Sequence, residues 1–316
     1  MKNRKWLWVV GIGLALLIVC VGSIGFTVLA MRGATSAGNL AVGEGIALIK
    51  VEGAITGGDP PTDLFGSSAA GAYSGRIVRQ LKRAEEDGDV KAIVLRVDSP
   101  GGGVVASDEI YAQILEMEKP ILVSMGTLAA SGGYYISAPT TEIWANRHTL
   151  TGSIGVIVQF INAEELIDKY GIDVTTIKTG SNKDTGSLFR NMTEEEIAIW
   201  QEIATESYDV FVQIVADGRG LDEAKVRELA DGRVYTGMQA LELGLVDNLG
   251  NLDDVIDRAA ELTGLGDEPR IIEYDQVPSP FGGLFGAFNR PSPVEEVRDL
   301  LQLNAAPVPM YLYTGE

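Results

Sequence analysis

AIVLRVDSPGGGVVASDEIYAQILEMEKPILVSMGTLAASGGYYIS, residues 92–137, carries most of the information about the fold. It opens with an apolar run (92–97), passes through a glycine-rich turn and continues as a helical pattern (107–118). A second apolar run (121–125) then leads through another glycine-containing turn to a helix predicted from Ser131. Apolar strands that alternate with helices are typical of a parallel sheet covered on both faces. The stretch therefore predicts an α/β fold.

The same alternation continues on both sides of this stretch. Apolar runs and amphipathic patterns predict further strands at 46–51, 142–145 and 174–177, and further helices at 76–85 and 193–217. The last of these helices has a capping box at its start, since Thr193 is followed three residues later by Glu196. Residues 45–275 are therefore expected to form the folded domain.

Composition excludes several classes of function. The 316 residues include 25 Lys and Arg against 44 Asp and Glu, for a net charge of −19. Binding of nucleic acid needs a basic surface, so nucleic acid is not an expected partner. One cysteine and one histidine leave neither an intrachain disulfide nor a zinc site of the usual nitrogen and sulfur type. No metal or cofactor is expected, and only His148 is available for Ser-His-Asp chemistry.

The N-terminal segment has the pattern of a membrane anchor. Residues 6–31 contain no charged side chain, and as a helix they would span about 39 Å, more than the hydrocarbon core of about 30 Å. The apolar part of a cleavable signal peptide is only about 7–15 residues long. Three basic residues precede the run and one follows it, which predicts a cytoplasmic N-terminus. Residues 1–32 are thus predicted to form a single-pass plasma-membrane anchor, with the rest of the chain on the outer face.

Two segments flank the predicted domain. Residues 33–44 are mostly small and suit a flexible linker. Residues 276–316 form a tail rich in proline and glycine, with one short helix predicted at 294–303. Two prolines within 305–316 disfavour a helix, so this end is expected to be extended. It is either a disordered terminus, a strand added to a sheet edge of a neighbouring subunit, or a segment lying along a substrate groove.

Two glycine-rich turns follow the apolar strands of the quoted stretch. Residues 98–103 read Asp-Ser-Pro-Gly-Gly-Gly, and residues 129–135 read Ala-Ala-Ser-Gly-Gly-Tyr-Tyr. Glycine allows several backbone N–H groups to point together at one oxygen. Ser131, flanked by alanine and glycine, is open to a substrate carbonyl and is a candidate nucleophile. Alternatively, the first turn only joins strand to helix, and Ser131 only caps its helix.

A serine nucleophile needs a base to accept its proton. His148 lies in a polar turn with no acidic partner nearby in the sequence. A lysine amine can replace histidine where burial favours its neutral form. The most suggestive lysine is Lys183, in Gly-Ser-Asn-Lys-Asp-Thr-Gly at 180–186. The residues alone do not decide whether His148 or Lys183 is the base. They also leave open that Lys183 is only a surface residue.

Six short motifs, in order, resemble the signal peptide peptidase A family. They are Ser-Pro-Gly-Gly (99–102), Ala-Ala-Ser-Gly-Gly-Tyr-Tyr-Ile-Ser (129–137), Thr-Gly-Ser-Ile-Gly-Val (151–156), Gly-x-x-Lys-Asp (180–184), Asp-Gly-Arg-Val-Tyr-Thr-Gly (231–237) and Gly-Leu-Val-Asp (244–247). The resemblance covers residues 45–275. It is closest to the short, single-unit form of that family with an N-terminal anchor.

The resemblance implies a fold and a set of site residues. The fold is that of the Clp protease and crotonase, built from repeated ββα units, and the activity is that of a serine peptidase with a Ser-Lys dyad. Carried over residue by residue, Ser131 matches the nucleophile and Lys183 the general base. Ser153 matches the hydroxyl that orients the lysine, and Gly102 and Gly132 match the backbone donors to the oxyanion.

The resemblance also implies substrates and partners. Members of the family cleave signal-peptide remnants in the membrane and other short or unfolded peptides. They assemble into homo-oligomeric rings, and the short form combines serine and lysine from neighbouring protomers. Two other interpretations are a crotonase-like acyl-CoA enzyme, which shares the fold without needing a nucleophilic serine, and a non-catalytic scaffold for membrane proteins. The presence of both Ser131 and Lys183 counts against the scaffold.

Overall fold

A computed structural model describes residues 43–61, 71–274 and 309–314. The strands are β1 (Gly45–Glu52), β2 (Ile55–Thr56), β3 (Ala72–Tyr73), β4 (Val90–Ser99), β5 (Gly101–Gly103), β6 (Ile121–Ala130), β7 (Glu142–Ala145), β8 (Leu150–Gly152), β9 (Val234–Thr236), β10 (Asn248–Leu249), β11 (Arg270–Glu273) and β12 (Met310–Leu312). The helices are α2 (Ser74–Glu86), α3 (Val104–Leu115), α4 (Gly132–Ser137), α5 (Glu164–Lys169), α6 (Glu194–Arg219), α7 (Glu223–Leu229), α8 (Gly237–Glu242) and α9 (Leu252–Thr263).

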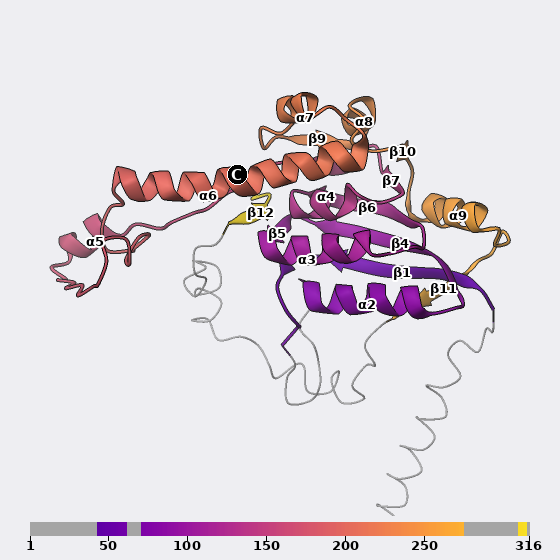
Figure 1. Cartoon of the computed structure of the whole chain (residues 1–316), viewed down its shortest axis with the longest axis horizontal. Helices are drawn as coiled ribbons and strands as arrows, with labels where there is room; N and C mark the ends of the chain where they lie inside the picture. Colours follow the sequence, from indigo (N-terminus) through magenta and orange to yellow (C-terminus); the bar gives the residue numbers. More distant parts are fainter. Residues whose placement is uncertain (1–42, 62–70, 275–308, 315–316) are drawn as a thin grey trace, which may run out of the picture. The chain divides into compact units, whose positions relative to one another are not determined.

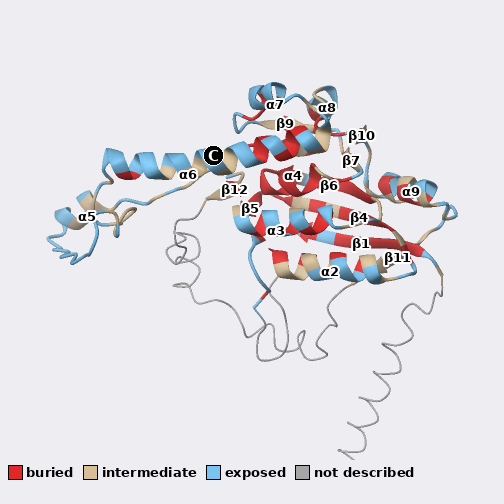
Figure 2. Ribbon diagram, in the orientation of Figure 1, coloured by how far each residue is buried: buried red, intermediate tan, exposed pale blue. Residues whose placement is uncertain are grey.

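The centre of the domain is a mostly parallel sheet. Its strands lie in the order β10-β7-β6-β4-β1-β11, and β8 pairs in parallel with the end of β6 (Figure 1). The long strands β1, β4 and β6 are paired in register and almost entirely buried (Figure 2). Their apolar side chains point alternately to the two faces, which is why each strand reads as a nearly continuous apolar run. The α/β fold with a parallel sheet is confirmed.

Helices cover both faces of this sheet. Helices α2, α3, α4 and the C-terminal half of α6 pack with the alternate residues Ala47, Ile49 and Val51 of β1. Helix α9 packs against Ile46 and Leu48 on the other face. The larger core lies on the first face, and the site described below is at its edge.

A second, smaller sheet stands beside the first. Its strands lie in the order β12-β5-β2-β3, so the glycine-rich turn 101–103 is itself a strand. Strand β12 comes from the C-terminal tail and pairs antiparallel with β5. The expectation of an extended tail is therefore confirmed for residues 310–312, and the disordered-end alternative is wrong for 309–314.

Two predicted elements differ from the structure. The helix predicted at 107–118 begins three residues earlier, because it starts directly after β5. Residues 174–177, predicted as a strand, form no regular element and are exposed, with Ile177 95% exposed. They have no sheet edge to join, because they belong to a projecting segment, residues 158–192, called the arm below. In Figure 1 helix α5 of the arm lies beside the N-terminal end of α6, away from the main sheet.

The predicted anchor at 6–31, almost all of the linker at 33–44 and the short helix at 294–303 lie outside the described residues. Within the described ranges, the structure contains no helix that is both long and apolar enough to cross a bilayer.

Candidate active site

Ser131 stands at a sharp turn from strand to helix. It follows the last residue of β6, precedes α4, and has φ 53° and ψ −116°, a conformation that costs a non-glycine residue free energy. Such a turn presents a serine hydroxyl at the end of a strand, as in the nucleophile elbows of hydrolases. The side chain is 1% exposed, and its Oγ has no hydrogen-bond partner among the described residues. A buried hydroxyl without a partner is available to a reacting group.

Ser153 lies next to Ser131. Strands β6 and β8 run in parallel with Ala130 opposite Gly152, so the two serines follow equivalent strand ends. The N–H of Ser131 donates to the carbonyl of Gly152 at 2.7 Å. Ser153 also has a positive φ, 49°, and is nearly buried. It lines a pocket of about 620 Å³ together with residues of α6 and of the C-terminal strand.

The glycine turn brings three backbone segments together. The N–H of Gly101 donates to Ser99 Oγ at 3.1 Å, which closes the turn. A Cβ at Gly101, whose φ is +98°, would lie 2.0 Å from the Tyr311 carbonyl oxygen and 2.5 Å from the Gly132 amide nitrogen. Only glycine fits there. Both the Tyr311 strand and the Gly132 turn therefore pack directly against the backbone of Gly101.

The amide of Gly102 faces the same carbonyl. Strand β12 pairs with β5 so that Tyr311 lies opposite Gly102. Two residues away on either side, Tyr313 N–H donates to Pro100 O at 2.8 Å and Val104 N–H to Pro309 O at 3.4 Å. Because bonded and non-bonded pairs alternate along an antiparallel ladder, Tyr311 and Gly102 form a bonded pair. The backbone amide of Gly102 is thus directed at the carbonyl of Tyr311, and the Gly132 segment lies on the other side of Gly101.

The C-terminal strand is held on its other edge as well. Met310 and Ile157 exchange two backbone hydrogen bonds, N–H of Ile157 to O of Met310 at 3.1 Å and N–H of Met310 to O of Ile157 at 3.0 Å. The strand therefore lies in a groove between β5 and the segment after β8. An extended peptide is recognised in the same way when it is added between two strand edges.

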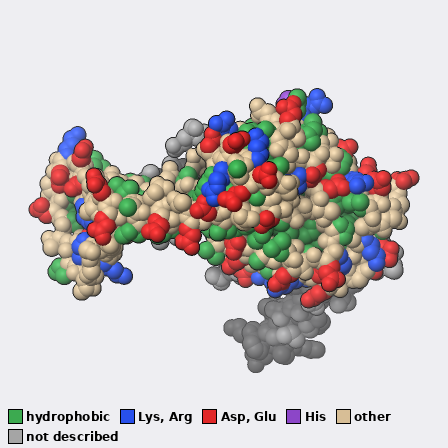
Figure 3. All heavy atoms as spheres, turned by 45° about the horizontal axis from the view of Figure 1, so that its top comes forward, with side chains coloured by type: hydrophobic (Ala, Val, Ile, Leu, Met, Phe, Trp, Pro, Cys, Tyr) green, Lys and Arg blue, Asp and Glu red, His purple; other side chains and the backbone are tan. Residues whose placement is uncertain are grey.

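Lys183 is not part of this cluster within one chain. It lies on the arm with its side chain exposed, and among the described residues its amine has no hydrogen-bond or ion-pair partner. The structure thus groups Ser131, Ser153, Gly102 and Gly132 but leaves Lys183 apart. His148, the other candidate base, is exposed in its turn and does not bond to Ser131 Oγ (Figure 3).

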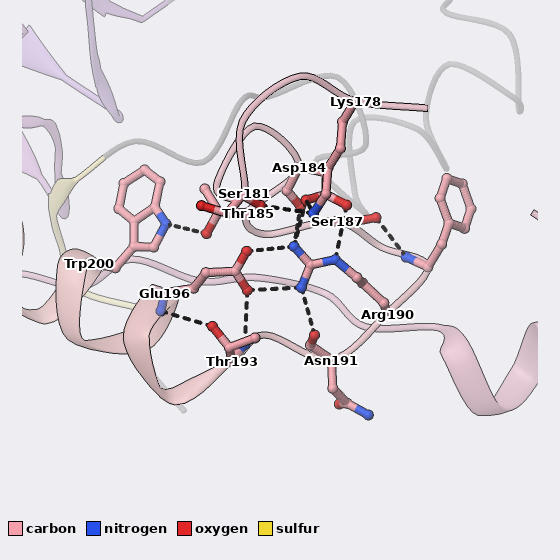
Figure 4. A network of polar contacts seen from close by, with 11 residues as sticks. Lys178, Ser181, Asp184, Thr185, Ser187, Arg190, Asn191, Thr193, Glu196 and Trp200 are labelled. Carbon is pink, nitrogen blue, oxygen red and sulfur yellow. Dashed lines mark hydrogen bonds and ion pairs between the residues drawn. The ribbon is translucent and has the colours of Figure 1, made fainter. Parts of the chain in front are cut away.

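A network of charged side chains holds the Lys183 loop against α6 (Figure 4). Arg190 bridges the neighbouring Asp184, at 2.7 Å, and Glu196 in the first turn of α6, at 2.5 Å. Lys178 forms an ion pair with Asp184 as well. Hydrogen bonds from Arg190 lower the pKa of Glu196 to about 2 and also lower that of Asp184. Both carboxylates therefore stay ionised at neutral pH, and their contribution to stability is lost only as the pH falls toward the lowered values.

The charged network and the groove lie at different points along helix α6. Glu196 anchors the network, whereas Ser207, eleven residues later, contacts the C-terminal strand. At 1.5 Å rise per residue these points are about 16 Å apart along the helix axis. The loop that carries Lys183 is thus fixed to the same helix as the groove, but at its far end.

Some site residues had no signal in the sequence. Ser107 Oγ is buried without a hydrogen-bond partner, and it would lie 2.6 Å from a Cβ at Gly132. Arg190 lies in no recognisable motif, although its partner Glu196 belongs to the predicted capping box, which is confirmed. In the described part of the chain, no three His, Cys, Asp or Glu side chains gather in a way that could hold a metal ion.

Comparison with known proteins identifies the family of the chain. The sequence profile of Peptidase family S49 matches residues 113–266, a range that includes Ser131, Ser153 and Lys183. A candidate protease of Synechocystis is 44% identical over 220 residues, covering 69% of this chain and 78% of the relative. A candidate signal peptide peptidase SppA of Enterococcus faecium is 41% identical over 251 residues, covering 75% and 72%.

A longer relative matches over part of its length. Protease 4 of Haemophilus influenzae is 35% identical over 232 residues, which are 72% of this chain and 36% of the relative. Its name and that of the Enterococcus protein both describe peptidases. The chain belongs to the signal peptide peptidase A family, within peptidase family S49, and is a serine peptidase.

Proposed function

We propose that the chain is a membrane-anchored serine endopeptidase in which Ser131 is the nucleophile and Lys183 the general base. The observation that carries the proposal is the state of Ser131, a buried hydroxyl without a hydrogen-bond partner at a strained turn beside a peptide-binding groove. Strained backbone concentrates at functional sites. The finer fold assignment, that of the Clp protease and crotonase, belongs to the same proposal.

The reaction follows from these two groups. The neutral amine of Lys183 takes the proton of Ser131, and Oγ attacks the carbonyl carbon of the peptide. The protonated lysine then returns the proton to the leaving amine, and the C–N bond breaks to leave an acyl-enzyme. Water, deprotonated by the same lysine, releases the acyl group and restores the serine.

Three further groups complete the proposed site, two backbone amides and one hydroxyl. The amides of Gly102 and Gly132 hold the oxyanion, since Gly102 pairs with a peptide carbonyl in the groove and Gly132 directly follows the nucleophile. Removal of one such donor typically costs about 3–4 kcal/mol of transition-state stabilisation. The Ser153 hydroxyl, beside Ser131 and lining the adjoining pocket, is positioned to orient the incoming lysine.

We assign Lys183 to the active site of a neighbouring copy. Its exposure and its separation from Ser131 in one chain support this assignment. The arm also exposes many large apolar side chains, which suits burial against another subunit (Figure 3). They are Ile161, Leu166, Tyr170, Ile172, Val174, Ile177 and Phe189. A homo-oligomeric ring would bring each arm to the next serine and would bury the lysine amine, favouring its neutral form.

The surroundings of the enzyme are part of the proposal. Residues 1–32 anchor the chain in the plasma membrane, residues 33–44 act as a linker, and residues 45–275 form the peptidase domain on the outer face. The substrates are remnants of signal peptides and other short or unfolded peptides, since a groove that binds extended backbone accepts unfolded chains. No cofactor takes part.

A serine-reactive fluorophosphonate tests the nucleophile. The probe is expected to label the full-length protein at Ser131, located by mass spectrometry of the digested protein, and to leave Ser131→Ala unlabelled. Ser137→Ala, which changes a serine on the same short helix α4, is the matched control and should label as the wild type does. Labelling at another residue, or unchanged labelling of a folded Ser131→Ala protein, would refute the assignment.

The Arg190 network is expected to act through the position of Lys183. Arg190→Ala leaves Asp184 and Glu196 without their shared cation, so the loop loses its fixed position. We expect kcat for a peptide to fall about 10- to 100-fold with KM within about threefold. Arg227, which also bridges two carboxylates but on α7, gives the control variant Arg227→Ala, which should keep wild-type kcat.

Two measurements separate a positioning role from a structural one. Arg190→Ala leaves the buried Glu196 without its cation, so its melting temperature should fall below that of Arg227→Ala, and kcat is compared well below both melting temperatures. Arg190→Lys should recover only part of kcat, because lysine lacks the planar fork that bridges two carboxylates. Equal kcat in the Arg190→Ala and Arg227→Ala proteins would show that the network does not position the base.

A further inference from the structure

A second serine hydroxyl near the site is in the same state as that of Ser131. Ser107, on helix α3, is 0% exposed, and its Oγ makes no hydrogen bond with any described residue. In the described ranges these two serines carry the buried hydroxyl groups that lack a partner. Leaving a buried hydroxyl unpaired costs stability, so such a group calls for an explanation.

The neighbouring helix shows what a serine hydroxyl inside a helix ordinarily does. Ser137, on α4, donates to the carbonyl of Gly133, one turn earlier, at 2.7 Å. Such a bond to the preceding turn is a common partner for a helical serine. Ser107 stands four residues after Gly103, the first residue before α3, but it does not make the equivalent bond. Its O–H is therefore not tied to its own helix and is free for another acceptor.

The Ser107 hydroxyl lies against the residue that follows the nucleophile. Helices α3 and α4 lie side by side (Figure 1). A Cβ at Gly132 would lie 2.6 Å from Ser107 Oγ and 3.1 Å from the Gly102 amide nitrogen. The hydroxyl and that amide therefore lie on the same side of Gly132, whose own amide directly follows Ser131. Ser107 is thus close to both residues whose amides are assigned to the oxyanion.

We propose that Ser107 Oγ is a third hydrogen-bond donor of the oxyanion site, together with the amides of Gly102 and Gly132. This inference rests on the proposed function, in which Ser131 attacks the peptide carbonyl. As Ser131 Oγ bonds to the carbonyl carbon, the π electron pair of the C=O bond moves to the oxygen. Rotation about the Cα–Cβ bond of Ser107 then turns its O–H to that oxygen. Ser107 keeps its proton, and the hydrogen bond is lost when the C=O bond re-forms and the amine leaves.

An unpaired donor is suited to this role. In the resting protein the Ser107 hydroxyl has no hydrogen bond to a described residue that would have to break first. A hydrogen bond to the oxyanion is then formed only in the transition state and the intermediate, and interactions of this kind raise kcat. Loss of the hydroxyl should therefore change kcat much more than KM.

Replacement of Ser107 by alanine should separate activity from stability. We expect kcat for a quenched fluorescent peptide to fall about 10- to 100-fold with KM within about threefold, because two backbone donors remain. The melting temperature should stay the same or rise, since the change removes an unpaired buried hydroxyl. Ser137→Ala is the control: it removes a bonded hydroxyl and should lower the melting temperature, with kcat within about threefold. A lowered melting temperature with unchanged kcat in Ser107→Ala would overturn the proposal.

A stable mimic of the tetrahedral intermediate tests the donor directly. The aldehyde acetyl-Leu-Leu-leucinal adds a serine hydroxyl to its carbonyl and forms a hemiacetal, whereas the alcohol acetyl-Leu-Leu-leucinol binds without reacting. Isothermal titration calorimetry of the full-length protein gives Kd for both compounds. The wild type and Ser137→Ala should prefer the aldehyde about 100-fold or more, and Ser131→Ala should have no preference. In Ser107→Ala the preference should fall about tenfold, with Kd for the alcohol within about twofold.

The set of variants distinguishes the ways in which the proposal can fail. A preference that is unchanged in Ser107→Ala but absent in Ser131→Ala would refute the third donor and leave the proposed nucleophile intact. Weakening of the alcohol and the aldehyde by the same factor would also overturn the third donor, because Ser107 would then act on the bound peptide before the reaction. Equal binding of both compounds by the wild type would refute Ser131 as the nucleophile and this inference with it.

Discussion

Alanine in place of either Ser131 or Lys183 is expected to lower kcat/KM for a peptide substrate about 10⁴-fold or more. The two groups act as one unit, since the serine is a poor nucleophile without a base and the base has nothing to activate without the serine. For the same reason the double variant should be no less active than either single variant. What activity remains would come from binding and from the amides of Gly102 and Gly132.

The lysine variant needs a matched control from the same arm. Lys169, at the end of α5, is also an exposed lysine of the arm. Lys169→Ala should therefore retain activity within about twofold, as should His148→Ala. Initial rates with a quenched fluorescent peptide, at equal oligomer concentration, give the comparison. If His148→Ala abolished hydrolysis and Lys183→Ala did not, the Ser-Lys assignment would be wrong.

The part of the site that is built from strand ends could be predicted from the sequence. Two apolar strands, each followed by a glycine-rich turn, are expected in one parallel sheet with both turns at the same edge, and the structure pairs β4 with β6. Ser131 and the glycines therefore meet at one edge of the sheet. The motif residues Ser131, Ser153 and Gly102 lie close to one another for this reason, although the strained φ of Ser131 has no signature of its own.

The arm could not be predicted, for a physical reason. Val174–Ile177 has the composition of a strand, yet strand formation depends on an edge to pair with, and in the described part of the chain this segment pairs with no strand. The Arg190 network also depends on the path of the arm, because Asp184 and Glu196 are neighbours only once the loop folds back on α6. Local patterns do not contain such contacts.

The C-terminal strand could be predicted from the sequence only in part. Its prolines and its apolar residues predicted an extended segment with three possible fates, but the choice among them depends on the free edge of β5. The burial of Tyr311 depends on ring contacts with Tyr135 of α4 and Phe211 of α6, which are far from each other in sequence. Period and composition could therefore suggest an extended strand but not which side chain it buries.

Mixed oligomers distinguish a dyad shared between subunits from one within a chain. Ser131→Ala and Lys183→Ala chains, co-expressed with different affinity tags and purified through both tags, form rings that contain both variants. With equal and random incorporation, about one interface in four combines an intact serine with an intact lysine from its neighbour. The mixed rings should then have about a quarter of the wild-type activity, while either variant alone has essentially none.

The geometry of one chain is the reason for this expectation. Ser131 Oγ has no hydrogen-bond partner among the described residues of its own chain, and the arm that carries Lys183 is held by Arg190 at the far end of α6. A dyad within one chain would require the ion pairs of Arg190 with Asp184 and Glu196 to break. A dyad shared between two chains leaves those ion pairs intact. Co-expressed Ser131→Ala and Lys169→Ala chains are the positive control for assembly, with about half the wild-type activity, because every Lys169→Ala chain keeps its own serine. Mixed rings of intact mass without recovered activity would place both residues of the dyad in the same chain.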